Sequence, residues 1–328
     1  MVKILNWNAR GLGLSVKRRY LSDLIKDHNI DLISIQETKK QTFSDRSLRA
    51  LSFSITQWFV LPSVGASGGL LLGFNDSIFS LVAFYIKQFS ITVHLRNKIN
   101  NFEWCYTTVY GPLTSDSRRV FLHELMDLGN LGIDAWLIMG DFNMIRRRSE
   151  RTGNTFSHVI SSRFNAFIRN NSLMELILSD RKYTWARSLN SSSQALLDRC
   201  FCTNAWNAHF TLAKLSSLSR VYSDHNPLLL DTQAVVFPIS KLIKFDKTWL
   251  EYDGFYDLVV SWWNECPLTI DLGLSWKLKL QSLRRKFRGW SSNVRGDKKR
   301  MKSDLLNRIS NFEHQLDNNC LREDDVDE

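Results

Sequence analysis

The chain has 328 residues, of which 44% are hydrophobic and 23% charged, with a formal net charge of +10. This length suits one large domain with an appendage, or two ordinary domains. The pI near 9.4 points to a polyanionic partner such as nucleic acid. Five scattered cysteines form no CxxC pair, which favours a reducing, nuclear or cytoplasmic compartment, and no run of 18 apolar residues predicts a membrane span.

The first 40 residues predict a strand, a helix and a second strand. Residues 2–7 form a strand-like apolar run that ends at Asn8. Apolar residues at helical spacing predict a helix over 16–28. Residues 30–35 predict a second buried strand, which is followed by Glu37. An amide and a carboxylate are therefore expected at two strand ends.

The middle of the chain alternates short apolar runs with turn residues, a pattern typical of antiparallel strands. We expect strands over 58–61, 69–74, 79–84, 91–95 and 102–110, helices over 117–128 and 158–170, and a strand over 228–230. No internal repeat is present.

Residues 135–139 predict another buried strand, and Gly140 allows a turn just before Asp141 and Asn143. Because residues two apart in an extended segment point the same way, we expect the side chains of Asp141 and Asn143 to share one face. A strand-end Asx turn explains these two residues equally well when they are taken alone. Residues elsewhere in the chain must decide between a functional pair of side chains and a structural Asx turn.

Polar residues from separate strand ends form the candidate site: Asn8, Glu37, Tyr110, Asp141, Asn143, Asp198, Asp224 and His225. Separated acids and an amide are hard oxygen ligands suited to Mg²⁺, with Mn²⁺ as an alternative. His225 can meet Asp198, which would fix the imidazole tautomer and raise its basicity. These groups suit phosphodiester hydrolysis, in which Asn143 and Tyr110 hold phosphate oxygens.

Residues 233–328 differ in character from the first 232, which carry 27 basic and 18 acidic residues, hence +9. Within this tail, residues 277–308 hold 12 basic and 2 acidic residues, whereas 309–328 hold 7 acidic and one basic. Apolar spacing predicts amphipathic helices, for which a solvated helical pair is the simplest explanation. We therefore expect one domain over 1–232 and a helical tail over 233–328 that is dispensable for cleavage.

Six motifs, in order along the chain, resemble those of the endonuclease/exonuclease/phosphatase superfamily. They are Asn6-Trp7-Asn8, Ile35-Gln36-Glu37-Thr38, Val109-Tyr110-Gly111-Pro112, Gly140-Asp141-Phe142-Asn143, Leu197-Asp198-Arg199 and Ser223-Asp224-His225-Asn226-Pro227. The NxRGLG start, residues 67–70 and Tyr183-Thr184-Trp185 are similar, more narrowly, to the apurinic-like endonuclease domain of plant LINE-type (non-LTR) retrotransposons. The resemblance covers residues 1–232, and residues 245–249 and 262–263 are similar to the linker before reverse transcriptase in such elements.

The resemblance implies a four-layer α/β sandwich, with two mixed, mainly antiparallel sheets between helices, and a C-terminal helical tail. It also implies a role for each residue of the candidate site. Glu37 is the principal metal ligand with Asn8 and Asp224 near the metal, Asp141 and Asn143 align the nucleophile, Tyr110 contacts phosphate, His225 pairs with Asp198, and Arg10 and Trp185 contact the substrate.

The expected function is a Mg²⁺-dependent DNA endonuclease that nicks a target strand and leaves a 3′-hydroxyl. Arg10 stands where repair apurinic endonucleases usually carry an acid, which argues against efficient repair of abasic sites. A downstream reverse transcriptase domain is a further expected partner, since this sequence has no polymerase motif with paired aspartates. The alternatives are a phosphatase or phosphodiesterase acting on small phosphoesters, and a catalytically dead nucleic-acid-binding relic.

Overall fold

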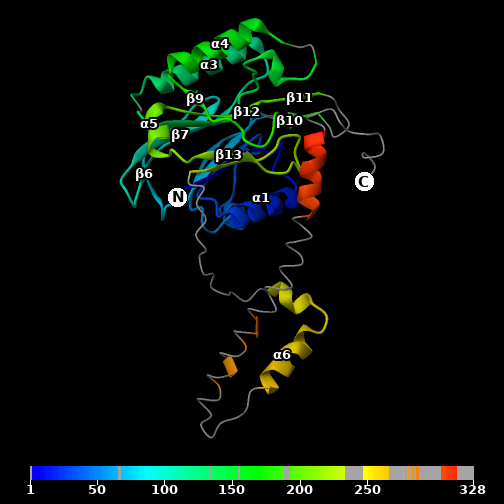
Figure 1. Cartoon of the computed structure of the whole chain (residues 1–328). Helices are drawn as coiled ribbons and strands as arrows, with labels where there is room; N and C mark the ends of the chain where they lie inside the picture. The colour runs from blue at the N-terminus through cyan, green and yellow to red at the C-terminus, as the bar shows by residue number, and fades with distance from the viewer. Residues whose placement is uncertain are drawn as a thin grey trace. The chain divides into compact units, whose positions relative to one another are not determined.

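A computed structural model describes residues 2–65, 68–132, 134–153, 156–187, 193–232, 247–265 and 304–315, with a few single residues between 276 and 287. The chain divides into two compact units, of which one comprises Met1–Ala234 with Ile309–Glu328 and the other Val235–Arg308 (Figure 1). The first unit therefore contains residues from both ends of the chain. The expected domain boundary at residue 232 stays a prediction.

Six strands form the first sheet, in the order β13-β14-β1-β2-β4-β3. Their bounds are β1 (Lys3–Asn8), β2 (Leu32–Gln36), β3 (Gln57–Leu61), β4 (Leu70–Phe74), β13 (Lys214–Ser217) and β14 (Leu228–Asp231). Strands β1 and β2 are parallel, with Asn8 opposite Gln36, and the other pairs are antiparallel. Because parallel strands end at the same edge, Asn8 and Glu37 emerge together.

The second sheet has the order β5-β6-β7-β8-β12-β9. Its strands are β5 (Phe79–Ile86), β6 (Ser90–Asn97), β7 (Glu103–Tyr110), β8 (Trp136–Asp141), β9 (Met174–Glu175) and β12 (Asp198–Cys202). Strands β7 and β8 are parallel, with Tyr110 opposite Asp141, and β12 runs antiparallel to β8 with Asp198 opposite Asp141. Three predicted site residues thus lie side by side at one edge. A short ribbon of β10 (Trp185–Ala186) and β11 (Gln194–Ala195) is separate.

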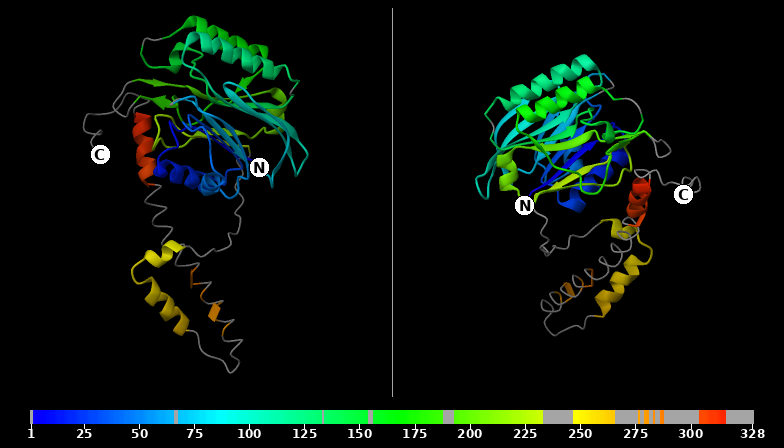
Figure 2. Two further views of the ribbon diagram at one scale, coloured as in Figure 1. Left: turned by 180° about the vertical axis from the view of Figure 1, so that it is seen from behind. Right: turned by 45° about the horizontal axis from the view of Figure 1, so that its top comes forward.

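Helices cover the outer faces of both sheets (Figures 1 and 2). Helices α1 (Ser15–His28) and α2 (Asp45–Leu51) pack on the first sheet, and α3 (Ser115–Gly129) and α4 (His158–Asn170) pack on the second. Adjacent residues of β1 show why the sheets are buried on both sides, since Ile4 belongs to the core between the sheets and Leu5 to the core beneath α1. The prediction of a four-layer α/β sandwich is confirmed.

Elements of two to seven residues were missed by the sequence patterns. They are α2, β9, β10, β11, β13 and α5 (Asn204–His209). Such segments are too short to display a hydrophobic period, so pattern alone does not identify them.

Two glycines allow backbone segments of the second sheet to approach each other closely at the edge that carries the predicted site residues. A Cβ atom at Gly140 would lie 2.1 Å from the carbonyl oxygen of Val109, and one at Gly111 would lie 2.1 Å from that of Phe142. Glycine is therefore required where β7 and β8 approach each other. This close approach brings Tyr110 beside Asp141.

Within the second unit, the described residues form η2 (Lys247–Glu251) and α6 (Phe255–Asn264). The rings of Trp249 and Phe255 are buried there and pack near Phe287. Two positions of the amphipathic pattern, Leu278 and Trp290, lie outside the described residues. Residues 304–315 are helical, as the pattern of the tail predicted. None of the helices formed by described residues is long and apolar enough to cross a membrane.

The Gly140→Ala variant should lose about 1–3 kcal/mol of unfolding free energy, because the added methyl group overlaps backbone of β7 that cannot move away. Urea denaturation of both proteins measures this difference. The matched control is Gly13→Ala, since no atom lies within 4 Å of a Cβ placed at Gly13. Equal stability of the two variants would show that β7 shifts without cost.

Candidate active site

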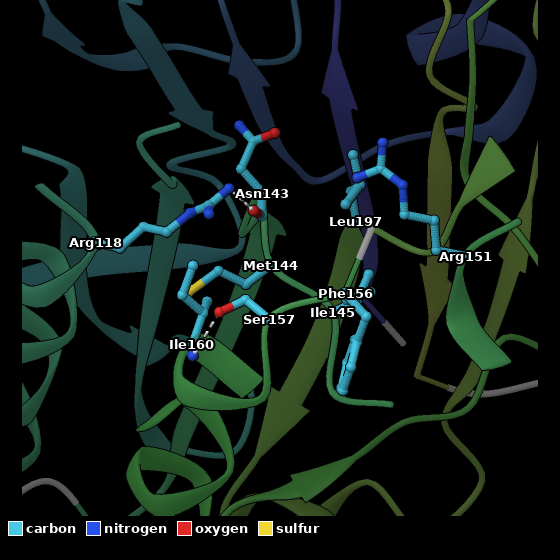
Figure 3. A pocket seen from close by; sticks show the side chains of 9 residues that line it. All are labelled: Arg118, Asn143, Met144, Ile145, Arg151, Phe156, Ser157, Ile160 and Leu197. Carbon is cyan, nitrogen blue, oxygen red and sulfur yellow. Dashed lines mark hydrogen bonds between the residues drawn. The ribbon is translucent and has the colours of Figure 1, made fainter. Parts of the chain in front are cut away.

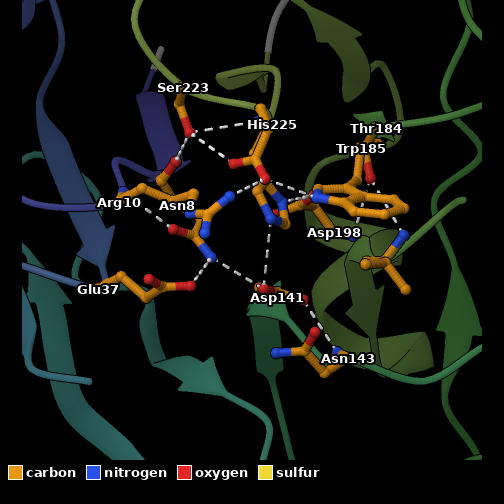
Figure 4. Close-up of polar contacts among 12 residues, drawn as sticks. Asn8, Arg10, Glu37, Asp141, Asn143, Thr184, Trp185, Asp198, Ser223 and His225 are labelled. Atoms are coloured by element: carbon orange, nitrogen blue, oxygen red, sulfur yellow. Dashed lines mark hydrogen bonds and ion pairs between the residues drawn. The ribbon is translucent and has the colours of Figure 1, made fainter. Parts of the chain in front are cut away.

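The side-chain amide of Asn8 bridges two carboxylates at the edge where the sheets meet. Its Nδ2 donates to Glu37 Oε1 at 3.1 Å and to Asp141 Oδ2 at 2.9 Å (Figure 4). Its Oδ1 accepts from the backbone N–H of Arg10 at 3.1 Å. The Asn8 side chain is fully buried, and its bond to Asp141 is buried as well, whereas the bonds with Glu37 and Arg10 are partly buried. Its amide nitrogen thus contacts both acids, and the predicted place of Asn8 at a metal stays a prediction.

An imidazole lies between two carboxylates in the same site. His225 Nδ1 is 2.8 Å from Asp198 Oδ2, and its Nε2 is 3.8 Å from Asp141 Oδ2 (Figure 4). All three side chains are buried. The pairing of His225 with Asp198, which we expected from the resemblance, is present in the structure.

Burial and these close charges shift both acid–base groups. Burial would lower the pKa of His225, but the carboxylates of Asp198 and Asp141 raise it to about 9. Burial also raises the pKa of Asp141 to about 7, although the positive charge of His225 opposes that rise. The pair therefore holds a proton at neutral pH, with an imidazolium facing Asp141.

Asn143 departs from the geometry that we expected. Strand β8 ends at Asp141, and Asn143 has a left-handed backbone with φ of 50°. The argument that both side chains share a face of one extended segment is therefore wrong. Instead, the Asn143 N–H donates to Asp141 Oδ1 at 2.9 Å, and Asn143 Nδ2 donates to the Gly111 carbonyl at 2.8 Å. The Asx turn is present, and it fixes the Asp141 carboxylate within the site.

Asp224 lies in the loop before β14, and its carboxylate contacts three described side chains. Its Oδ2 accepts from Trp185 Nε1 at 2.8 Å and forms an ion pair with Arg10. Its Oδ1 has a long contact of 3.5 Å with Ser223 Oγ. Trp185 and Arg10, which we predicted to contact substrate, both contact the Asp224 carboxylate in this structure.

Cations surround the Glu37 carboxylate. Lys39 Nζ lies 3.8 Å from Glu37 Oε2, and Lys17 Nζ donates to the Ala9 carbonyl at 2.7 Å. Burial, and then the positive charge of Lys39, lower the pKa of Lys17. Tyr110 donates a hydrogen bond to Glu37, and burial together with the Glu37 charge raises the pKa of the phenol. The site thus combines acids with several cations that can face a polyanion.

The donor chemistry fits a hydrated hard cation at Glu37 and Asp224. Their side chains are 15% and 10% exposed, whereas Asp141 and Asp198 are at most 1% exposed. A Mg²⁺ ion keeps several waters and needs only one or two carboxylates, so partly exposed acids suit it best. Among the described His, Cys, Asp and Glu residues, the atoms of Asp141, Asp198 and His225 lie within 4.8 Å of one another. There, however, the imidazole already balances the acids.

A second group of charges holds the strand that carries Asp198. The guanidinium of Arg199 is buried and bonds to Glu150 and to Glu175 Oε1, the latter at 2.5 Å. Thr184 Oγ1 accepts from the backbone N–H of Asp198 at 3.0 Å. We did not predict these supporting roles from the sequence. The adjacency of Arg199 to Asp198 in an LDR motif was the available signal.

A cavity of about 400 Å³ adjoins Asn143 (Figure 3). It is lined by Arg118, Asn143, Met144, Ile145, Arg151, Phe156, Ser157, Ile160 and Leu197. Arg118 donates to the Asn143 carbonyl at 2.7 Å, and Arg151 Nε is buried with no hydrogen-bond partner among the described residues. Two guanidinium groups beside an apolar wall suit a group that carries both negative charge and a flat apolar surface.

The chain is a two-sheet α/β sandwich that gathers acids, an amide and a histidine at its sheet ends. The chain matches the model of the Endonuclease/Exonuclease/phosphatase family over residues 5–225, and it belongs to this family. A search of curated proteins finds no match to this chain.

Solved structures with the same fold include nucleases and a phosphatase. A variant of the 3′ phosphatase NExo from Neisseria, bound to a product DNA hairpin, is 15% identical with a TM-score of 0.55, over 70% of this chain and 99% of that one. AP endonuclease LMAP from Leishmania major is 14% identical with a TM-score of 0.56, over 70% and 86%. The endonuclease domain of TRAS1, a telomere-specific non-LTR retrotransposon, is 14% identical with a TM-score of 0.54, over 70% and 98%. At this identity the likeness shows the fold.

The Asp198→Asn variant should lower the pKa of His225 by about one unit or more, since it removes the nearest negative charge. NMR titration of the imidazole measures this pKa. The folded-state pKa of about 9 exceeds the ordinary value of 6.5, so the charged imidazole stabilises the fold below pH 6.5 and this contribution is lost as pH rises through 9. The stability difference between variant and parent should therefore shrink at high pH. Asp127→Asn, beside the exposed His123, is the control, and an unchanged pKa of His225 in Asp198→Asn would contradict the assignment.

Proposed function

We propose that this protein is a Mg²⁺-dependent endonuclease of LINE-type retrotransposon origin that nicks DNA and leaves a 3′-hydroxyl. The observation that carries the proposal is the line Asp198–His225–Asp141, which lies beside the Asn8–Glu37 pair at one edge of the sandwich. Family membership supports the reaction class, because nucleases and phosphatases share this fold.

Asp141 and His225 have the protonation properties that the reaction requires. Asp141, with a pKa near 7, accepts a proton from the attacking water. His225, held as an imidazolium, faces the negative phosphate oxygens and offsets their charge as the transition state forms. The water oxygen bonds to phosphorus, the bond from phosphorus to the 3′ oxygen breaks, and that oxygen takes a proton. The products are a 5′-phosphate and a 3′-hydroxyl.

Glu37, the principal ligand, with Asp224 and the neighbouring Asn8, would hold the divalent ion. Bound there, Mg²⁺ or Mn²⁺ supplies positive charge against the phosphate oxygens. Asn143 is fixed by Gly111 and by Asp141, so it presents a rigid polar group to the substrate. Tyr110, whose hydroxyl bonds to Glu37, would contact the phosphate.

The charge distribution favours DNA over a small phosphoester. The first 232 residues carry a net charge of +9, from 27 basic and 18 acidic residues. Arg118 and Arg151 stand in a cavity beyond the carboxylates, where a further part of a long polyanion can lie. A substrate with one phosphate would give these two cations no phosphate group to contact. The proposal extends to a nuclear or cytoplasmic location and to a reverse transcriptase domain as partner in target-primed integration.

Nicking of supercoiled plasmid tests the reaction. Full-length protein should nick with Mg²⁺ and should stop when EDTA is present. Glu37→Gln, Asp141→Asn and His225→Ala should each reduce the rate by about 10² or more while DNA binding persists, because each removes a group that acts on the reacting phosphate. Glu103→Gln and His123→Ala, on exposed residues away from the site, are matched controls. Near-parental nicking by any of the three site variants would remove that residue from the mechanism.

The salt dependence of binding tests the class of substrate. Affinity for duplex DNA should fall at least a hundredfold between about 50 and 200 mM salt, since several phosphates are contacted. Arg151→Gln should reduce the logarithmic salt slope by about 1, as loss of one phosphate contact predicts. Fluorescence anisotropy measures both quantities. Arg169→Gln, an equal charge change on the exposed end of α4, should leave the slope unchanged, and a flat salt response of the parent would favour the small-phosphoester alternative.

A further inference from the structure

A glutamate from the C-terminal segment is buried against the catalytic unit. Glu313 lies in the helical residues 304–315 and is 2% exposed. Its carboxylate forms an ion pair with Arg181, and its Oε1 lies 3.6 Å from Arg220 Nε. The backbone N–H of Arg220 donates to the same oxygen at 2.9 Å. Two loops of the catalytic unit, around Arg181 and Arg220, therefore converge on one tail residue.

The contact continues to the residue that follows His225. Asn226 Nδ2 lies 3.4 Å from Glu313 Oε1 and 3.3 Å from its Oε2, and it donates to the Leu218 carbonyl at 3.0 Å. The backbone N–H of Asn226 donates to the Thr184 carbonyl at 2.9 Å. Glu313 thus lies directly behind the loop that presents Asp224 and His225.

A second side chain of the tail extends the contact. Arg181 Nη2 donates to both the carbonyl and the hydroxyl oxygen of Ser310, each at 3.1 Å. Ser310 and Glu313 are three residues apart, so they lie on one face of the helix. The contact of this helix face is specific, because the single guanidinium group of Arg181 interacts with three oxygen atoms from Ser310 and Glu313.

The charges explain why this contact is selective. The side chains of Arg181 and Arg220 are only 3% and 7% exposed, and removal of one partner from a buried ion pair leaves an uncompensated charge. Burial raises the pKa of Glu313, and the two guanidinium groups oppose that rise. Without an acid at this position, the buried guanidinium of Arg181 would lose its carboxylate partner.

We propose that the segment beginning at Ile309 docks on the catalytic unit in cis, and that Glu313 is a positioning residue that holds the loop carrying Asp224 and His225. The chain then leaves the catalytic unit after residue 234 and returns to it at residue 309, so Val235–Arg308 is attached at both ends. This inference replaces our expectation that the whole tail is dispensable. Docking stands apart from the proposed nuclease activity, and only its effect on turnover rests on that function.

Docking is tested on the full chain with a specific protease site inserted between residues 291 and 300. After cleavage under native conditions, the C-terminal fragment should co-elute with the body in gel filtration. Glu313→Lys should release the fragment, because it places a third cation beside Arg181 and Arg220. Asp304→Lys, the same charge reversal at an exposed position of the same helix, should not. Separation of the fragment in the parent protein, or its retention by Glu313→Lys, would overturn the docking proposal.

Positioning is tested on uncut protein by amide hydrogen exchange and by nicking. Glu313→Gln should speed exchange at Arg220 and Asn226 by about tenfold or more, since the Arg220 N–H donates to Glu313 and the side chain of Asn226 contacts the same carboxylate. It should also lower kcat by about tenfold with little change in KM, whereas Asp304→Asn should change neither. Unchanged exchange at both amides overturns the positioning role. Exchange does not require activity, so it decides the proposal even if the parent protein fails to nick DNA.

Discussion

Asn8 is the last residue of β1 in the first sheet, and Asp141 is the last residue of β8 in the second. The side-chain amide of Asn8 bonds to Asp141 and so connects the two sheets. It donates to Asp141 across the sheet interface and to Glu37 within its own sheet. Each of these acids has its position set by a different layer of the sandwich. The relative placement of the two sheets therefore determines whether the acids meet at one point.

Further polar pairs fix that placement deeper between the sheets. Gln36 Nε2 donates to Thr108 Oγ1 at 2.9 Å, and Ser34 Oγ lies 2.6 Å from the Tyr106 hydroxyl. All four residues are fully buried. A buried polar group without a partner is costly, so a slip of one sheet over the other would break several such bonds together. Apolar contacts alone would tolerate such a slip more easily, because they are not directional.

Much of the fold and part of the site followed from the sequence. Buried apolar runs that end in polar residues located β1, β2 and β8. The parallel pairing of β1 with β2 places Asn8 beside Glu37, and Asp141 meets Asn8 across the interface between the two sheets. Asp198 and His225 were paired by their chemistry, and their atoms lie 2.8 Å apart. These inferences succeeded because strand periodicity and acid–base complementarity are visible in the local sequence.

Other features depend on contacts that local sequence does not encode. The direction of the Asn143 side chain follows from a left-handed backbone that starts after β8 ends, and no periodic pattern reports such a turn. The partner of Glu313 is Arg181, more than a hundred residues earlier in the chain. An acid in a strongly acidic tail looks like one of many solvated charges, and only the fold distinguishes it. Sequence reasoning therefore fails where one residue out of a similar group finds a buried partner.

The ion pair between Arg10 and Asp224 gives Asp224 an environment that differs from that of Glu37. A cation at position 10 takes one oxygen of Asp224, and Trp185 donates to the same oxygen. The Oδ1 atom of Asp224 has only the long contact with Ser223 Oγ among the contacts of the described residues. Glu37 has no arginine against it among the described residues, and its nearest ammonium, Lys39, is 3.8 Å away. The two acids that we propose as ligands of a divalent ion therefore differ in their cationic neighbours, an arginine at Asp224 and a lysine at Glu37.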